Sequence, residues 1–246
     1  MKILAEGPAF SEEAGRLAAR LNAEAVTDPD EAAAEEQYLR LGADGLSLVQ
    51  GKMSLRGDFT ELLPRITGGH LQHEKILRAV KLKDLPETPL AVDCTAGLGE
   101  DSFIIAAAGF RVILCEYNPL ICALLRDALE RAKRDPGTAE TAGRMELREG
   151  NSVETLAALT ERPDVIYLDP MFPEKQKSGI STKKLQLFKT LEAPCGDEAE
   201  LMEAAVRACP RRIVVKRPVK GPFLAGKKPG HAIACRNIRY DCYTIS

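Results

Sequence analysis

The stretch Leu90-Ala-Val-Asp-Cys-Thr-Ala-Gly-Leu-Gly99 decides the fold of this chain. Its first residues are apolar and are typical of a buried strand, while the two glycines allow a tight turn whose backbone lies close to a ligand. A second apolar run, residues 111–115, ends at Glu116, which lies 23 positions after Asp93. An acid at that place can accept hydrogen bonds from both hydroxyls of a ribose. The pattern predicts a binding site for a nucleoside cofactor.

Strand-like and helical segments alternate from Pro89 onward. We expect strands at 90–93, 111–115, 145–149, 165–168 and 212–216, and helices at 101–108, 119–134, 153–159 and 198–208. This alternation is typical of a mostly parallel sheet with helices on both faces. Two β-rich runs, 231–237 and 239–245, follow without a helix between them and predict an antiparallel hairpin. The fold class is therefore α/β with a Rossmann-like sheet.

The first 65 residues do not show this alternation. Residues 1–4 predict a short strand, residues 11–21 an amphipathic helix, and residues 38–59 two or three short strands. We therefore expect a small α+β extension over residues 1–65 and a Rossmann-like domain over residues 66–246. A helix is expected at 73–80, beside the cofactor.

Composition excludes several classes of protein. The 34 basic and 36 acidic side chains nearly cancel, so the whole-chain charge does not indicate a nucleic-acid partner. The seven cysteines form no C-x-x-C pair, and we expect them to be reduced and structural. The sequence contains no apolar run of 18 residues and no secretory leader pattern, so we expect a cytoplasmic protein without a membrane span. The three histidines and the scattered cysteines do not form a metal-binding pattern, and no metal is expected.

The glycine turn departs from the dinucleotide-binding pattern. Gly97 and Gly99 supply the first two glycines of G-x-G-x-x-G, but Ser102 stands at the third position, which disfavours a dinucleotide. Asp101 would repel a pyrophosphate, whereas it can accept a hydrogen bond from the ammonium of an amino-acid moiety. The missing third glycine and Asp101, together with the motif after the fourth strand that is described next, favour S-adenosylmethionine as the cofactor.

That motif is Asp169-Pro-Met-Phe172, directly after the apolar run 165–168. Methyl transfer from a sulfonium depends mainly on the position of the nucleophile, because the leaving group is already activated. The lone pair of an exocyclic amine is delocalised into its ring, so two acceptors are needed to orient it. An acid-Pro-x-aromatic motif after a strand resembles that of enzymes that methylate exocyclic or amide nitrogens. This resemblance implies that Asp169 and the carbonyl of Pro170 are the catalytic acceptors and that the ring of Phe172 stacks on the base. The alternative is a proline-rich turn without a catalytic role.

Basic segments lie just after two strand ends, at residues 174–189 and 211–228. Charge runs are usually solvated faces, but a basic rim beside a pocket suits contacts with RNA phosphates. The expected RNA contacts are Lys175, Lys177, Lys183, Lys184, Lys216 and Arg217.

Taken together, these motifs resemble the bacterial 16S ribosomal RNA (guanine-N2) methyltransferase J family. The resemblance is carried by residues 92–103, 116–119, 165–178 and 214–218, and it covers roughly residues 60–246. It implies that the chain uses S-adenosylmethionine to methylate the exocyclic N2 of a guanosine, in 16S rRNA or the 30S subunit. Beside Gly97 and Gly99, the cofactor contacts implied by the family are Glu100, Asp101, Glu116, Tyr117, Asn151, Ser152 and Asp169. Glu100 and Tyr117 stand where the family frequently has arginine, and Asn151 where it frequently has serine.

Three alternatives remain open from the sequence. The same cofactor could serve a methyltransferase that acts on a protein amide, a DNA amine or a small molecule. The chain could instead be a non-catalytic RNA-binding factor for ribosome assembly. An NAD-dependent oxidoreductase is least favoured, because the third dinucleotide glycine is absent and the Asp-Pro motif would have no role there.

Overall fold

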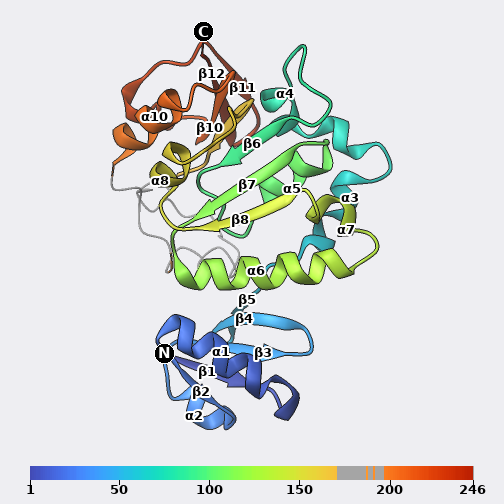
Figure 1. Cartoon of the computed structure of the whole chain (residues 1–246), viewed down its shortest axis with the longest axis vertical. Helices are drawn as coiled ribbons and strands as arrows, with labels where there is room; N and C mark the ends of the chain where they lie inside the picture. Colours follow the sequence, from blue (N-terminus) through green and yellow to red (C-terminus); the bar gives the residue numbers. More distant parts are fainter. Residues whose placement is uncertain (171–186, 188–190, 192–196, 246) are drawn as a thin grey trace.

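Two β-sheets and one long helix between them define the architecture (Figure 1). The computed structural model describes residues 1–170, 187, 191 and 197–245. The helix, α6 (Pro119–Arg134), contacts the larger sheet on one side and the smaller N-terminal sheet on the other. Its start is determined locally, since the Asn118 side chain accepts hydrogen bonds from the N–H groups of Leu120 and Ile121 and Pro119 opens the first turn.

The larger sheet has the strand order β11-β12-β10-β9-β6-β7-β8. Its strands are β6 (Leu90–Asp93), β7 (Arg111–Glu116), β8 (Met145–Glu149), β9 (Val165–Leu168), β10 (Arg212–Pro218), β11 (His231–Ala234) and β12 (Ile238–Thr244). Strands β8, β7, β6, β9 and β10 are parallel, while β12 pairs antiparallel with both β10 and β11. The predictions of a mostly parallel sheet and of a C-terminal hairpin are confirmed.

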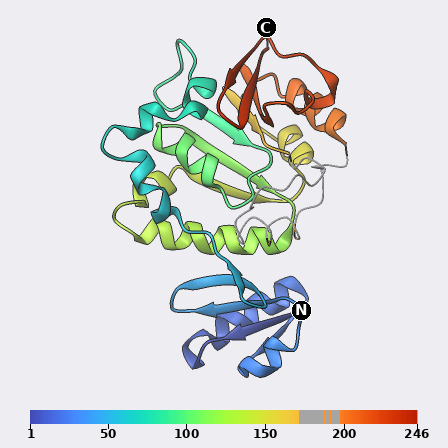
Figure 2. The same ribbon diagram turned by 180° about the vertical axis from the view of Figure 1, so that it is seen from behind.

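Helices cover both faces of this sheet (Figure 2). One face packs against α4 (Lys75–Val80), α5 (Glu100–Ala107), α7 (Ala139–Ala142) and part of α6. The other face packs against α8 (Ser152–Ala157) and α10 (Glu198–Arg207). Because apolar groups lie on both sides, the central strands β6 and β9 are buried at every residue.

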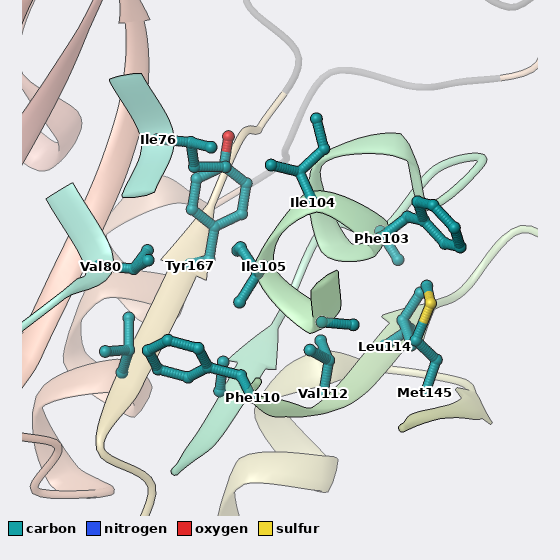
Figure 3. Close-up of a cluster of buried hydrophobic side chains, with 14 of the residues drawn as sticks. Ile76, Val80, Phe103, Ile104, Ile105, Phe110, Val112, Leu114, Met145 and Tyr167 are labelled. Carbon is teal, nitrogen blue, oxygen red and sulfur yellow. The ribbon is translucent and has the colours of Figure 1, made fainter. Parts of the chain in front are cut away.

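Helix α5 follows the glycine turn and is almost entirely embedded. Figure 3 shows Phe103, Ile104 and Ile105 of this helix between the sheet and the neighbouring helices. Phe103 also stacks on Phe59, with ring centroids 4.8 Å apart. The packing holds α5 against the sheet and so determines where its first turn, which carries Asp101, points.

The N-terminal sheet has the order β2-β1-β3-β4-β5. It consists of β1 (Lys2–Ala5), β2 (Glu24–Val26), β3 (Tyr38–Gly42), β4 (Gly45–Gln50) and β5 (Met53–Leu55), with helices α1 (Ser11–Leu21) and α2 (Pro29–Ala33). Strand β1 is parallel to β2 and β3, and the remaining pairs are antiparallel. The expected strand, helix and short strands are present, whereas the short elements β2 and α2 were not expected from the sequence.

The connection between the sheets is built from short helical turns. It contains the 3-10 turn η2 (Phe59–Leu62), helix α3 (Leu63–Ile66) and the 3-10 turn η3 (His70–His73), ahead of α4. The expected helix at 73–80 therefore starts two residues later than the pattern indicated. Two further 3-10 turns are η1 (Pro8–Phe10) and η4 (Leu224–Gly226). Among the described residues, no helix has the length and apolar character needed to cross a membrane.

Leu124 tests the docking of α6 on the N-terminal sheet. Its side chain is fully buried in the apolar cluster that also contains Ile3 and Leu39. We expect Leu124→Ala to lower the free energy of unfolding by about 2 to 5 kcal/mol through lost burial and a residual cavity. Lys133→Ala on the exposed face of the same helix is the control, with an expected change within about 0.5 kcal/mol. Urea unfolding measures both, and equal effects of the two variants would contradict this packing.

Candidate active site at the carboxyl edge of the sheet

Four strands deliver charged side chains to one edge of the larger sheet. Asp93 and Glu116 are the last residues of β6 and β7, Asp169 directly follows β9, and Lys216 lies near the end of β10. These strands are parallel neighbours, so their carboxyl ends meet. From β6 the chain runs outward through β7 and β8 and then returns to β9 on the other side of β6, so the strand order reverses between β6 and β9. Open α/β sheets bind ligands at the carboxyl ends of the strands beside such a reversal.

Asp93 is buried beneath this edge, with 2% of its surface exposed. Its carboxylate accepts hydrogen bonds from the Ser102 hydroxyl at 2.6 Å and from the Thr95 N–H at 3.0 Å. Burial raises the pKa of Asp93 to about 7; these hydrogen bonds oppose the shift, and the nearby charges of Asp101 and Asp169 add to it. The Thr95 hydroxyl in turn accepts a hydrogen bond from the Asp169 N–H at 2.6 Å. Asp93 thus links the glycine turn, α5 and the start of the Asp-Pro motif.

The glycine turn requires both of its glycines. Gly97 and Gly99 have φ values of 55° and 78°, in the left-handed region that favours glycine. A Cβ atom on Gly99 would lie 2.9 Å from Leu125 Cδ1, so the turn also needs the missing side chain for close packing. The Gly97 N–H donates to Glu116 Oε2 at 3.0 Å.

Glu116 is held by the backbone on both sides. Its Oε2 accepts from Gly97 and its Oε1 accepts from the Asn118 N–H at 2.8 Å, while only 4% of the residue is exposed. Burial raises the pKa of Glu116, and these backbone hydrogen bonds oppose the shift. Each carboxylate oxygen has a further lone pair, so Glu116 can still accept hydrogen bonds from a ligand.

A lysine bridges two of the acids. Lys216 Nζ lies 2.7 Å from Asp101 Oδ2 and 2.9 Å from Asp169 Oδ2. Burial acts to lower the pKa of Lys216, but the two carboxylates outweigh it and the pKa is raised. Removal from bulk water raises the pKa of Asp169, and the Lys216 ammonium acts in the opposite direction. Asp101 also accepts a hydrogen bond from the Tyr167 hydroxyl at 2.6 Å.

The structure corrects the expected basic rim at β10. Arg217 is 1% exposed and donates to Glu198 Oε1 at 2.8 Å, so the expectation that it contacts RNA is wrong. Lys216 faces the acids of the site, and its ammonium is engaged by two carboxylates. The other four lysines expected to contact RNA, Lys175, Lys177, Lys183 and Lys184, lie outside the described residues.

The remaining candidate residues, apart from Phe172, have described positions in the structure. Glu100 opens α5, and Tyr117 follows Glu116 with 58% of its surface exposed. The Asn151 side chain caps α8 by accepting a hydrogen bond from the Val153 N–H at 2.8 Å, and Ser152 is the first residue of that helix. Pro170 is buried after β9, and Phe172 lies outside the described residues.

Sequence reasoning missed several polar residues that complete the site. These residues are Asp93, Thr95, Ser102 and Tyr167. Asp93 carried a signal, since an acid ends an otherwise apolar buried strand. Among the residues that the structure describes, no group of three or more histidine, cysteine, aspartate or glutamate side chains could hold a metal ion.

The donor and acceptor chemistry of this edge fits S-adenosylmethionine. The glycine turn allows close approach of the ligand to the backbone. Glu116 at the end of β7 suits the ribose hydroxyls, and Asp101 in the first turn of α5 suits the ammonium. Fold and site together define a Rossmann-like, class I S-adenosylmethionine-dependent methyltransferase.

Comparisons with known proteins lead to the same class. A family model described as "Putative SAM-dependent methyltransferase" matches residues 25–245. The chain is 40% identical to a ribosomal RNA small subunit methyltransferase J from Aeromonas hydrophila, over 100% of this chain and 98% of the relative. It is 48% identical to the protein of that name from Thioalkalivibrio sulfidiphilus, over 70% and 68% of the two chains. The crystal structure of a SAM-dependent methyltransferase from Neisseria gonorrhoeae superposes with a TM-score of 0.77 at 32% identity, covering 100% of this chain and 96% of that one. The chain belongs to the ribosomal RNA small subunit methyltransferase J family of SAM-dependent methyltransferases.

Asp93 provides a pH-dependent test of the site. Its pKa of about 7 exceeds the value near 3.9 of an unfolded aspartate, so the folded state binds the proton more tightly. The stability contribution of Asp93 is therefore full below about pH 4 and is lost as the pH rises to about 7. We expect the D93N variant to gain stability relative to the wild type across this window and to show a constant difference above it. Urea unfolding from pH 4 to 8 measures the difference, and a constant difference throughout would contradict the raised pKa.

Proposed function

We propose that this chain transfers a methyl group from S-adenosylmethionine to the exocyclic N2 of a guanosine in 16S ribosomal RNA. The observation that carries the proposal is the position of Asp169, at the end of β9 and next to Asp101 across Lys216. An acceptor for the target amine and an acceptor for the cofactor ammonium are thereby adjacent. The names of the relatives support ribosomal RNA of the small subunit as the substrate class.

The cofactor would lie along the glycine turn. We assign the ribose hydroxyls to Glu116 and the ammonium of the methionine moiety to Asp101, with backbone contacts from Gly97 and Gly99. The further cofactor contacts that we propose are Glu100, Tyr117, Asn151, Ser152 and Asp169. When bound, S-adenosylmethionine supplies a methyl group that its sulfonium has already activated.

The target amine would be held by the Asp-Pro motif. The Asp169 carboxylate and the Pro170 carbonyl accept its two N–H hydrogens, which turns the nitrogen lone pair towards the methyl carbon. Phe172 stacks on the guanine face. Asp169 would also be placed to accept the proton that the target nitrogen gives up on methylation.

The RNA would approach over the mouth of this site. We retain Lys175, Lys177, Lys183 and Lys184 as proposed phosphate contacts, with 16S rRNA or the 30S subunit as the partner. Such a substrate implies a cytoplasmic location. We also propose the division into an N-terminal extension, residues 1–65, and a methyltransferase domain, residues 66–246.

The proposed activity can be tested in a strain that lacks the gene for this chain. We expect mass spectrometry of its 16S rRNA to show the loss of one N2-methylguanosine, which the wild-type gene restores. Calorimetric titration of the purified protein with S-adenosylhomocysteine should give saturable binding, with NADH as the negative control. Retention of every N2-methylguanosine in the deletion strain would refute the substrate, and failure to bind S-adenosylhomocysteine would favour a non-catalytic assembly factor.

Asp169→Ala separates catalysis from folding. The side chain lies at a strand end with 39% of its surface exposed, so its loss leaves the apolar core intact. We expect the rate of methyl transfer to fall by at least about 100-fold, because both orientation and proton acceptance are lost. The thermal midpoint should stay close to that of the wild type in the same buffer. A folded variant with wild-type turnover would exclude the assigned role.

A further inference from the structure

We propose that Lys216 is a positioning residue for the reaction: its ammonium holds Asp169 as an oriented carboxylate, ready to accept a hydrogen from the target amine. This inference rests on the proposed function and adds a residue to it. The sequence had suggested a different role for Lys216, as a surface contact for RNA.

The contacts of the ammonium define its role. Lys216 Nζ lies within hydrogen-bonding distance of Oδ2 of both Asp101 and Asp169, at 2.7 and 2.9 Å. Both are charge-assisted interactions, which are stronger than neutral hydrogen bonds. With 24% of its side chain exposed, Lys216 is less available to an RNA phosphate than a surface lysine. Because the ammonium takes Oδ2 of Asp169, we assign Oδ1 to the target amine.

Lys216 lies within strand β10, so the pairing of β10 with β9 determines its position beside Asp169. In the register between β10 and β9, Val215 lies opposite Leu168, so the next residues along the two strands are Lys216 and Asp169. On its other side, Lys216 lies opposite Tyr240 of β12. Strand β10, which carries Lys216, is hydrogen-bonded to β9 on one side and to β12 on the other. A lysine held in this way can fix the orientation of a neighbouring carboxylate.

The electrostatic surroundings make such a cation necessary. The described titratable groups that bear on Asp169 are Asp93 on β6, Asp101 on α5, Tyr167 on β9, Lys216 and Arg217 on β10, and Tyr240 on β12. Burial and the Asp101 charge favour the protonated form of Asp169, while Lys216 and Arg217 favour the carboxylate. Of the two cations, Lys216 has its Nζ 2.9 Å from Asp169 Oδ2, and Arg217 pairs with Glu198. A protonated Asp169 has lost acceptor capacity, so removing Lys216 should weaken the hold on the amine.

The titration of Asp169 in the ligand-free protein tests the proposal directly. The ¹³C carboxyl resonance of Asp169, assigned with the D169N variant, is followed by NMR from pH 3 to 10. We expect K216M to raise the midpoint by about 1 to 3 pH units, the range for loss of a nearby opposite charge. K216R, which keeps the charge, and K133M, which removes an exposed lysine of α6, should titrate like the wild type. An unchanged midpoint in folded K216M would overturn the proposal, and K216Q serves as the neutral variant if K216M does not fold.

Methyl transfer gives the second readout. We expect the acid limb of the kcat/KM profile of K216M to move to higher pH, so that the variant recovers as the pH is raised, while the acid limb of K216R stays at the position of the wild type. A loss that is uniform across pH would indicate a structural role and would count against the proposal. Since the NMR titration needs neither cofactor nor RNA, it decides the role of Lys216 even if 16S rRNA is not the substrate.

Discussion

The buried carboxylate of Asp93 is the point on which the site is assembled. A carboxylate removed from water is costly unless donors surround it, and here the donors come from the glycine turn and from α5. Thr95 continues the chain of hydrogen bonds to the backbone of Asp169. The end of β6, the first turn of α5 and the Asp-Pro motif after β9 therefore adopt their positions together, and the apolar packing of α5 seen in Figure 3 holds this arrangement against the sheet.

The charge of the site matches the chemistry of its cofactor. Asp93, Asp101, Glu116 and Asp169 gather at one edge of the sheet, and Lys216 is the cation that contacts two of them. Close acids disfavour one another's ionised form, so Asp101 and Asp169 add to the raised pKa of Asp93, of which burial is the main cause. S-adenosylmethionine carries a sulfonium and an ammonium, so an acid-rich edge attracts it, whereas it would repel the pyrophosphate of a dinucleotide. Asp101, one of the acids that favour S-adenosylmethionine over a dinucleotide, also favours the protonated form of Asp169, and Lys216 opposes that protonation.

The sequence predicted those parts of the molecule that depend on local patterns. Helix α6 was predicted with its observed bounds, and in the structure its start is determined locally by Asn118 and Pro119. The glycine turn was predicted from Gly97 and Gly99. The roles of Lys216 and Arg217 could not be read this way. Neighbouring strand residues point to opposite faces, so two adjacent basic residues meet different partners: the acids beside α5 in one case and Glu198 of α10 in the other. These pairings join residues far apart in the chain and depend on which strands become neighbours, which a linear charge run does not reveal.

Helix α6 lies between the N-terminal sheet and Glu116, the acid assigned to the ribose. Its cap residue, Asn118, donates its backbone N–H to Glu116 and its side-chain amide to the Leu191 carbonyl at 2.6 Å. Leu191 and the α6 residue Leu120 pack against the same apolar cluster as the strands of the N-terminal sheet. The acid assigned to the ribose is thus held at the end of a helix whose opposite side supports the extension. The N-terminal sheet thus packs against the helix whose cap residue donates a hydrogen bond to Glu116, although none of its strands carries a residue assigned to the site.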